Sequence, residues 1–294
     1  MRESSHRKTK FSPIFNFQQV ILLTNELGGF GGFRMAKTQK ADDSLEQNEE
    51  LSKLFFELDS ESRLSILQKL KDRGLRMQEV ARTLGLGDTE TSRQLQRLSE
   101  AMLIQKQPDG VYSITQNGKL LQEFSHSFEF VVKFKQCLVS RDLWRLPYQF
   151  IERLGELSEA NLITDVSEMM NSFENIILGA EKFLFFIGRK PIRSLSVKAG
   201  KPVEKGVPLK LLFDEENRDY YRNYVGNKYF EMRAIPTVPA IMVVSEKCAT
   251  INLLSLDNRQ DVRMFYGEDP KILKWATDLF QYYWDQGRHW KQPF

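Results

Sequence analysis

Few residues in this sequence suit covalent bridging or metal binding. The 294-residue chain holds two cysteines, Cys137 and Cys248, and three scattered histidines. Two cysteines are too few for a disulfide framework, and no spacing of Cys and His indicates a zinc site. We therefore expect a cytoplasmic protein with no metal and no cofactor. Either cysteine could be a redox sensor, although the apolar strand around Cys248 favours a buried structural role.

The sequence also lacks the motifs of common enzyme classes. It has no P-loop, G-x-G-x-x-G, G-x-S-x-G or HExxH pattern, and the glycines of 28–32 neither follow a predicted strand nor begin a helix. The Phe-rich stretch of 11–23 is interrupted by polar residues, so it predicts neither a membrane span nor a signal peptide. We expect no catalytic residues, no enzymatic activity and no membrane contact.

An excess of one charge is missing as well. The chain has 42 Lys and Arg against 39 Asp and Glu, and residues 1–34 carry five of the former and two of the latter. The rest of the chain therefore has 37 of each. Residues 1–49 are predicted to be a disordered leader. Two origins stay open for it, an extension ahead of a true start at Met35 or a basic arm that contacts DNA.

What the sequence does contain is a helical pattern over 60–118 that ends in a short hairpin. Gly74 is expected to stop the first helix, Gly85 and Gly87 to form a tight turn, and Asp88 or Thr89 to cap the third helix. An Asp-Gly turn at 109–110 between two alternating segments predicts a β-hairpin. The pattern indicates a winged helix-turn-helix domain over 50–119. The apolar positions of its three helices are Leu64, Ile66, Leu67 and Leu70, then Met77, Val80, Ala81 and Leu84, then Leu95, Leu98 and Met102.

The third helix is the expected recognition helix, which in such domains enters the major groove of DNA. Arg pairs there with guanine and Gln with adenine, and Ser and Thr hold phosphates. The predicted DNA-binding residues are the polar side chains of its outer face and of the wing: Thr89, Thr91, Ser92, Arg93, Gln94, Gln96, Arg97, Lys106, Gln107 and Tyr112. Residues 50–120 hold 11 Lys and Arg against 10 Asp and Glu. This near neutrality predicts modest non-specific DNA binding.

Apolar helical stripes lie on both sides of this module. Before it, Leu51, Leu54, Phe55 and Leu58 could pack on the module or on a partner subunit. After it, residues 120–141 predict a linker helix that Pro147 and the residues before it interrupt. Its apolar positions are Leu121, Phe124, Phe128, Val131, Val132 and Phe134. We favour a dimer contact for this helix over packing within one chain.

Strands and helices alternate from 142 to 290, which predicts an α/β domain with parallel strands followed by an antiparallel run. The predicted strands are 183–187, 207–213, 229–235, 239–245, 248–254 and 262–266. The predicted helices are 148–157, 165–180, the first half of 191–204, 215–225 and 269–286. Ligands bind beyond the carboxyl ends of strands in such sheets. The candidate ligand-binding residues are Arg189, Asp214, Arg233, Asp257 and Asn258.

The C-terminal half also resembles an archaeal regulator family whose chains join a winged helix to a domain of the methanogenesis-regulator or filament-regulator type. The resembling segments are 146–147, 183–187, 233–236 with Pro239, 240–254, 265–270 and the aromatic helix from Trp275 to Trp284. The resemblance covers 50–290. It implies a phospholipase-D-like fold without the catalytic residues, and the sequence contains no complete H-x-K-x-x-x-x-D motif. The aromatic helix is expected to serve core and dimer packing.

We therefore expect a homodimeric transcription regulator that binds double-stranded DNA and has a C-terminal domain that senses a small-molecule effector or mediates assembly. Two alternatives stay open. One is a winged-helix protein–protein adaptor, which the near-neutral charge favours. The other is an enzyme that acts on a nucleotide or a phosphorylated small molecule and carries the winged helix as an accessory.

Overall fold

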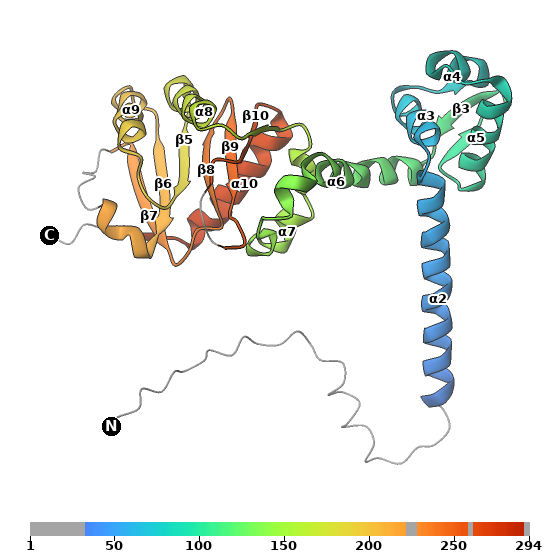
Figure 1. Ribbon diagram of the computed structural model, residues 1–294, viewed down its shortest axis with the longest axis horizontal. Coiled ribbons are helices and arrows are strands. Elements are labelled where there is room, and N and C mark those ends of the chain that lie inside the picture. The colour runs from blue at the N-terminus through green and yellow to red at the C-terminus, as the bar shows by residue number, and fades with distance from the viewer. Residues whose placement is uncertain (1–32, 222–227, 258–260, 291–294) are drawn as a thin grey trace. The chain divides into compact units, whose positions relative to one another are not determined.

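The computed structural model describes residues 33–221, 228–257 and 261–290 (Figure 1). The chain folds as two compact units, divided in sequence between Ile114 and Thr115. The first unit holds the predicted winged helix and the second the predicted α/β domain. Residues 1–32 of the expected leader lie outside the described residues. Among the helices that the structure describes, none is long and apolar enough to cross a membrane.

Helix α2 (Phe33–Leu58) precedes the winged helix and includes residues 36–49, for which the sequence predicts disorder. That prediction is wrong for this segment. Residues 35–58 contain neither Gly nor Pro and are rich in Ala, Leu, Lys, Gln and Glu, which favour helix. Of the predicted apolar stripe, Leu54 and Leu58 are half-buried, whereas Leu51 and Phe55 are exposed.

The winged helix follows in the predicted order. Its elements are α3 (Glu61–Asp72), β1 (Leu75–Arg76), α4 (Met77–Leu84), α5 (Asp88–Glu100), β2 (Ile104–Lys106) and β3 (Val111–Ile114). Strand β3 lies between β1 and β2 and is antiparallel to both. Apolar residues of all three helices form the core, with Ile66, Leu70, Val80, Leu95 and Leu98 fully or almost fully buried.

The turn between α4 and α5 is formed partly as predicted. Gly85 has φ 65° in the left-handed region, which only glycine adopts without cost. Gly87 has φ −70° and occupies the N-cap position of α5, so the expected caps Asp88 and Thr89 lie inside the helix. Glycine is an acceptable N-cap residue, and both helix ends therefore fit the local sequence.

Gly74 serves packing rather than helix termination. Helix α3 ends at Asp72, and a Cβ atom on Gly74 would lie only 2.6 Å from Cγ1 of Val111 in the wing. Any larger residue at this position would push strand β3 away from the helices.

The third helix ends earlier than its apolar spacing predicts. Helix α5 stops at Glu100, and Met102, expected on the inner face, is exposed with φ 56°. Leu103 enters the core instead, and its N–H donates to the carbonyl oxygen of Leu98 at 2.9 Å. This tight reversal sends the chain directly into the wing.

The second unit begins with helix α6 (Gln116–Leu138), whose first turn is capped by the Thr115 hydroxyl. Short helices follow at η1 (Leu143–Arg145), α7 (Tyr148–Ile151) and η2 (Leu154–Leu157), in place of one helix over 148–157. Since α6 ends well before Pro147, proline does not terminate it. Just after the helix ends, Arg141 forms a β-bridge with Ser255.

A mixed eight-stranded sheet forms the centre of this unit. Its order is β11-β7-β6-β5-β8-β9-β10-β4. The strands are β4 (Asn161–Ile163), β5 (Leu184–Gly188), β6 (Leu209–Asp214), β7 (Phe230–Ile235), β8 (Ala240–Ser245), β9 (Ala249–Leu253), β10 (Met264–Gly267) and β11 (Arg288–His289). Strands β5, β6 and β7 are parallel, and β8, β9 and β10 pair antiparallel, which confirms the predicted change. The sequence pattern does not predict the short edge strands β4 and β11.

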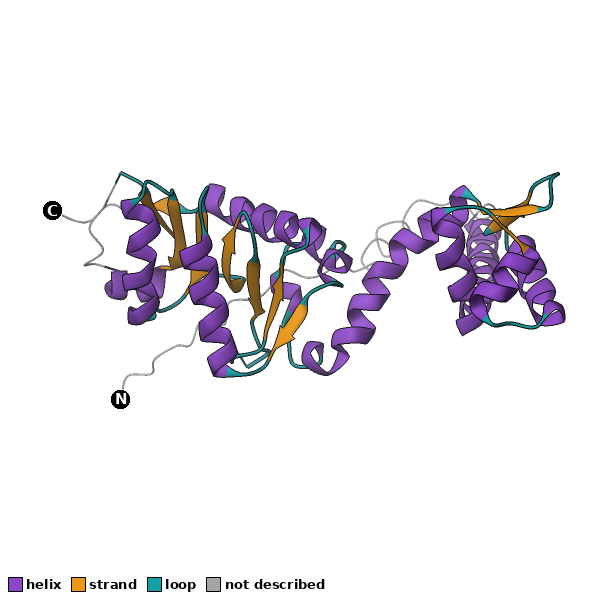
Figure 2. Ribbon diagram, turned by 90° about the horizontal axis from the view of Figure 1, so that it is seen from above, coloured by secondary structure: helices purple, strands orange, loops and turns teal. Residues whose placement is uncertain are grey.

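Helices cover both faces of the sheet (Figure 2). Helices α8 (Val166–Gly179) and α9 (Arg193–Glu204) pack on one face, and α10 (Pro270–Gln286) packs on the other with α6 and α7. Helix α9 includes most of the predicted first half of 191–204 and continues to the end of that segment. The predicted helix over 215–225 is a 3-10 helix, η3 (Glu215–Tyr221), within the described residues.

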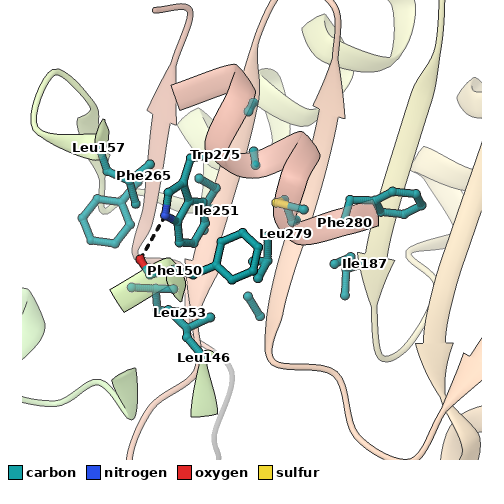
Figure 3. Packing of buried hydrophobic residues seen from close by; sticks show 14 of the residues in the cluster. Leu146, Phe150, Leu157, Ile187, Ile251, Leu253, Phe265, Trp275, Leu279 and Phe280 are labelled. Atoms are coloured by element: carbon teal, nitrogen blue, oxygen red, sulfur yellow. Dashed lines mark hydrogen bonds between the residues drawn. The ribbon is translucent and has the colours of Figure 1, made fainter. Parts of the chain in front are cut away.

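Trp275 of α10 lies in the larger core (Figure 3). It is fully buried, and its Nε1–H donates to the Phe150 carbonyl oxygen at 3.2 Å. Phe280 and Trp284 are also buried, so the expected core role of the aromatic helix is confirmed. Tyr282 is 38% exposed at the margin of this core.

Both cysteines are buried. Burial raises the pKa of the Cys248 thiol above its ordinary value, which disfavours the reactive thiolate. The structural role expected for Cys248 is consistent with this environment.

Candidate nucleic-acid interface

Four of the predicted DNA-binding residues lie along one exposed face of α5. Thr89, Ser92, Arg93 and Gln96 are all exposed. Their positions differ by three, four and seven residues, which places them on one side of a helix. The face carries hydroxyl, guanidinium and amide groups, which are the donors and acceptors used on phosphates and base edges.

Two predicted contacts, Thr91 and Gln94, are wrong because both side chains are buried. Thr91 is 0% and Gln94 4% exposed, and they share the inner face of α5 with Leu95 and Leu98. Gln94 accepts a hydrogen bond from Nη1 of the buried Arg63 at 2.8 Å. Its amide nitrogen also donates to Glu90. The polarity of Gln94 therefore serves to satisfy a buried arginine rather than to face solvent.

Arg97 lies at the edge of the exposed face and is held by α2. Its Nε and Nη2 donate to the two carboxylate oxygens of Glu57 at 2.9 and 2.6 Å. The guanidinium also lies 5.1 Å from the centre of the Phe56 ring. Hydrogen bonding from Arg97 lowers the pKa of Glu57, so the pair is ionised at neutral pH. Arg97 is thus a partly engaged cation rather than a free reader of bases.

Arg63 of α3 also binds the end of α2. Its side chain donates to the backbone carbonyl oxygens of Phe56, at 2.8 Å, and Glu57. These are orphan carbonyls of the last helical turn, which need partners from outside the helix. Sequence reasoning missed Arg63 because an arginine in an amphipathic helix is normally assigned to the solvent face.

Arg93 is the most available cation on α5. Its side chain is 65% exposed and pairs with Glu90 at 2.6 Å, three residues earlier on the same helix. Gln96 is similarly engaged, since its amide donates to Glu100 at 2.8 Å. Exposed pairs of this kind contribute little to stability, so a phosphate or base edge can replace the acidic partner at small cost.

The wing presents the remaining predicted residues. Lys106 is exposed and its Nζ lies 5.7 Å from the centre of the half-buried Tyr112 ring. Gln107 is half-buried, and its amide donates to the Ser113 hydroxyl at 3.0 Å. The Asp-Gly turn closes as expected, with Gly110 at φ 84°. Lys106 is therefore the wing residue best placed for a phosphate.

The structure adds Arg82 to the candidates. It is exposed on α4, the helix that precedes the turn into α5. In helix-turn-helix proteins this earlier helix crosses the DNA backbone, where a cation contacts phosphate. The sequence signal was an Arg-Thr pair at 82–83 on the polar side of an amphipathic helix.

Among the described residues, the structure brings together two of the predicted ligand-binding residues of the second unit, Arg189 and Asp214. Arg189 pairs with Asp214 through Nε at 3.1 Å, and Asp214 is 1% exposed, so burial raises the pKa of its carboxyl. Arg233 instead lies 4.6 Å from the Trp284 ring centre and donates to the Trp284 carbonyl oxygen at 2.7 Å. Asp257 accepts from the Ser255 hydroxyl at 2.6 Å. Asn258 lies outside the described residues.

A cavity of about 410 Å³ lies between α9 and the sheet, and Arg189 is the one predicted ligand residue among its lining residues. Among the residues that the structure describes, no group of three or more His, Cys, Asp and Glu side chains could hold a metal ion.

Residues 206–286 match the family model of the methanogenesis regulatory protein FilR1, middle domain. The resemblance of the C-terminal half to a methanogenesis-regulator domain is thereby confirmed for this segment. The comparison with curated proteins found no match.

Three solved structures are similar to the chain at low identity. TrmBL2, described as an archaeal chromatin protein with a novel mode of DNA binding, is 16% identical, with a TM-score of 0.39 over 76% of this chain and 91% of that one. NucT from Helicobacter pylori is 11% identical and the phospholipase D family member Nuc from Salmonella typhimurium is 14% identical. Each has a TM-score of 0.38 and covers 45% of this chain and 99% of its own.

Proposed function

We propose that this protein is a transcription regulator that binds double-stranded DNA as a homodimer, with α5 in the major groove. The observation that carries the proposal is the exposed face of Thr89, Ser92, Arg93 and Gln96 on a helix that follows a tight turn. The match of residues 206–286 to a domain of a regulatory protein supports a regulatory role.

The proposed contacts follow from exposure and chemistry. Arg93 and Gln96 read base edges, because their planar side chains make paired hydrogen bonds to guanine and adenine. Thr89, Ser92 and the wing residue Lys106 hold phosphates, which position the helix without reading sequence.

Selection of sites from a random DNA library with the full chain, near physiological salt, tests the proposal. We expect an inverted repeat with half-sites about one helical turn apart. On that site, Arg93→Ala costs about 1–3 kcal/mol of binding free energy and relaxes specificity at one position. Lys274→Ala, which removes an exposed cation from α10, is the matched control and leaves binding unchanged. Recovery of no enriched sequence contradicts the proposal.

The dimer contact is proposed to lie on α6. Leu120, Phe124, Phe128, Val131 and Val132 are 50–67% exposed and fall on one side of the helix. Contiguous exposed apolar surface of this kind marks interaction sites. A dimer also doubles the phosphate contacts, which offsets the near-neutral charge of each winged helix.

Sedimentation of the full chain measures the dimer contact directly. Phe124→Gln shifts the chain towards the monomer, because it removes a large apolar side chain from the proposed interface. Lys119→Gln on the same helix is the control, since Lys119 is exposed on the side of α6 opposite the apolar stripe. A Phe124→Gln protein that stays dimeric removes α6 from the interface.

A protein–protein adaptor is the second candidate, favoured by the balance of 11 cations and 10 anions over 50–120. Salt dependence separates the two. A DNA-binding regulator loses affinity steeply as salt rises, because phosphate contacts release counterions. An adaptor shows no such loss.

We do not propose an enzymatic activity. The sequence contains two His-x-Lys triplets, which begin at His6 and His289, but no complete H-x-K-x-x-x-x-D motif. His126 lies on α6, where its Nδ1 is 3.0 Å from the Glu129 carboxylate. His289 lies in edge strand β11. No histidine of this sequence therefore belongs to a complete motif of the phospholipase D type.

A further inference from the structure

A partly open cavity lies beneath α9. It measures about 410 Å³, within the usual range for small-molecule sites. Its lining residues come from α8, α9, β5 to β8 and the segment between β5 and α9. Helices α8 and α9 lie over this side of the sheet (Figure 1).

Two glycines keep this space open. Gly188 ends β5 and Gly200 lies on α9, and both line the cavity. A Cβ atom added to either would meet no atom within 4 Å. The aromatic and aliphatic side chains between them, Phe186, Leu211 and Phe230, are only half-buried because nothing fills the space above them. The body of the cavity is therefore apolar and accessible.

One end of the cavity is cationic. Arg189 and Lys190 follow β5 and line the cavity where α9 begins. Asp214, itself bound by the Val238 N–H, fixes the Arg189 guanidinium through Nε. Lys190 adds a second positive charge at this end, and its Nζ lies 5.3 Å from the Tyr220 ring centre.

The helix dipole reinforces this end. Ile192 occupies the N-cap position of α9 and has no side-chain acceptor, so the first backbone N–H groups are left for other partners. The acidic lining residue, Glu204, is the last residue of α9. It follows Arg193 by eleven residues, which corresponds to about 16 Å along the helix axis. Charge is therefore separated along the cavity, with cations at one end.

We propose that this cavity binds a small amphipathic carboxylic acid. The hydrocarbon or aryl part lies against Phe186, Leu211 and Phe230, and the carboxylate lies near Arg189 and Lys190 at the start of α9. The role of such an acid as an effector rests on the proposed regulatory function. Binding of the acid to the cavity does not depend on that function. Acid binding and DNA binding are measured in separate experiments.

Isothermal titration calorimetry of the full chain with octanoate tests the proposal, with 1-octanol as the neutral analogue. We expect saturable binding of one octanoate per chain with a negative heat-capacity change, since apolar surface is buried. The acid binds at least about tenfold more tightly than the alcohol, and Lys190→Gln reduces that preference. Equal binding of acid and alcohol, or no saturable binding of octanoate, overturns the proposal.

Gly200→Leu fills the cavity and lowers octanoate affinity at least about tenfold. Gly179→Leu is the matched control, because Gly179 is also helical with open space around it but lies outside the cavity lining. Binding that is unchanged in Gly200→Leu overturns the assignment of the site. Since DNA binding is assayed without octanoate, failure here leaves the proposed function intact, and failure of DNA binding leaves the cavity result intact.

Discussion

Replacing Glu57 by Gln should make the winged helix less stable and yet bind DNA more tightly. Glu57 lies at the end of α2, where its carboxylate accepts two hydrogen bonds from Arg97 of α5. Glutamine keeps the size of the side chain but removes its charge. The exchange therefore weakens the hold on Arg97 and leaves that cation free to reach a phosphate.

The expected stability loss is modest. The Glu57 side chain is 19% exposed and that of Arg97 is 32% exposed, so solvent screens part of the interaction. Bidentate charge-assisted bonds exceed the exposed-pair value, and we expect a loss of about 1–2 kcal/mol in the free energy of unfolding. Arg63 loses its ion pair with the Glu57 carboxylate, at 3.4 Å from Nε, but Gln94 and two backbone carbonyls still accept hydrogen bonds from it.

The DNA measurement is fluorescence anisotropy over a series of salt concentrations. One additional phosphate contact steepens the slope of log affinity against log salt by about 0.9. The double variant Glu57→Gln with Arg97→Gln loses this gain if Arg97 is its source. Glu50→Gln, which removes an exposed acid paired with Lys53 on α2, controls for the general loss of negative charge. A salt slope unchanged in Glu57→Gln would refute the reasoning.

Three further outcomes follow from the same structure. Hydrogen bonding from Arg97 lowers the pKa of Glu57 below its usual 4.5 in the folded chain. The stabilisation from this pair is therefore present above pH 4.5 and disappears as pH falls through the folded pKa. Urea midpoints measured between pH 6 and 3 show this loss, and Glu57→Gln flattens the dependence of the midpoint on pH. Gly74→Ala costs about 1–3 kcal/mol by contact with Val111, and Val111→Ala restores part of the loss in a urea titration. Trp275→Phe removes the donor to the Phe150 carbonyl oxygen and lowers the free energy of unfolding by about 1–3 kcal/mol. An unchanged melting temperature would show that this hydrogen bond does not stabilise the fold.

The winged helix could be predicted from sequence because each element carries a local signal. Apolar spacing defined the three helices, and the Asp-Gly dipeptide at 109–110 defined the hairpin. The structure confirms these elements to within a few residues. The change from parallel to antiparallel strands in the second unit was predictable because helical segments connect the first strands, whereas short turns connect the later ones.

The faces of α5 were less predictable. Helical spacing alone places Thr91 and Gln94 beside Leu95 and Leu98, but polar side chains are usually assigned to the outside. The reason for a buried Gln94 is Arg63, which is 31 positions earlier in the chain and needs an acceptor. A contact between distant residues leaves no periodic signal in the sequence.

All but one of the candidate ligand residues that the structure describes lie outside the cavity lining, and Arg189 is the exception. Arg233 lies within β7 and bonds Trp284, and Asp257 follows β9 and bonds Ser255. The cavity itself depends on Gly188 and Gly200, where side chains are missing. Empty space between layers becomes visible only once the helices have been placed on the sheet.

Arg63 has a consequence for where the winged helix can be cut from the chain. Its guanidinium is shared between Gln94 inside the module and the carbonyls of Phe56 and Glu57 ahead of it. A fragment that starts at Ser60 would look complete by its helices and wing but would leave this buried cation with one partner of three. The smallest fragment that folds on its own therefore begins in α2. Its N-terminal boundary is determined by Arg63 rather than by the start of the first helix of the motif.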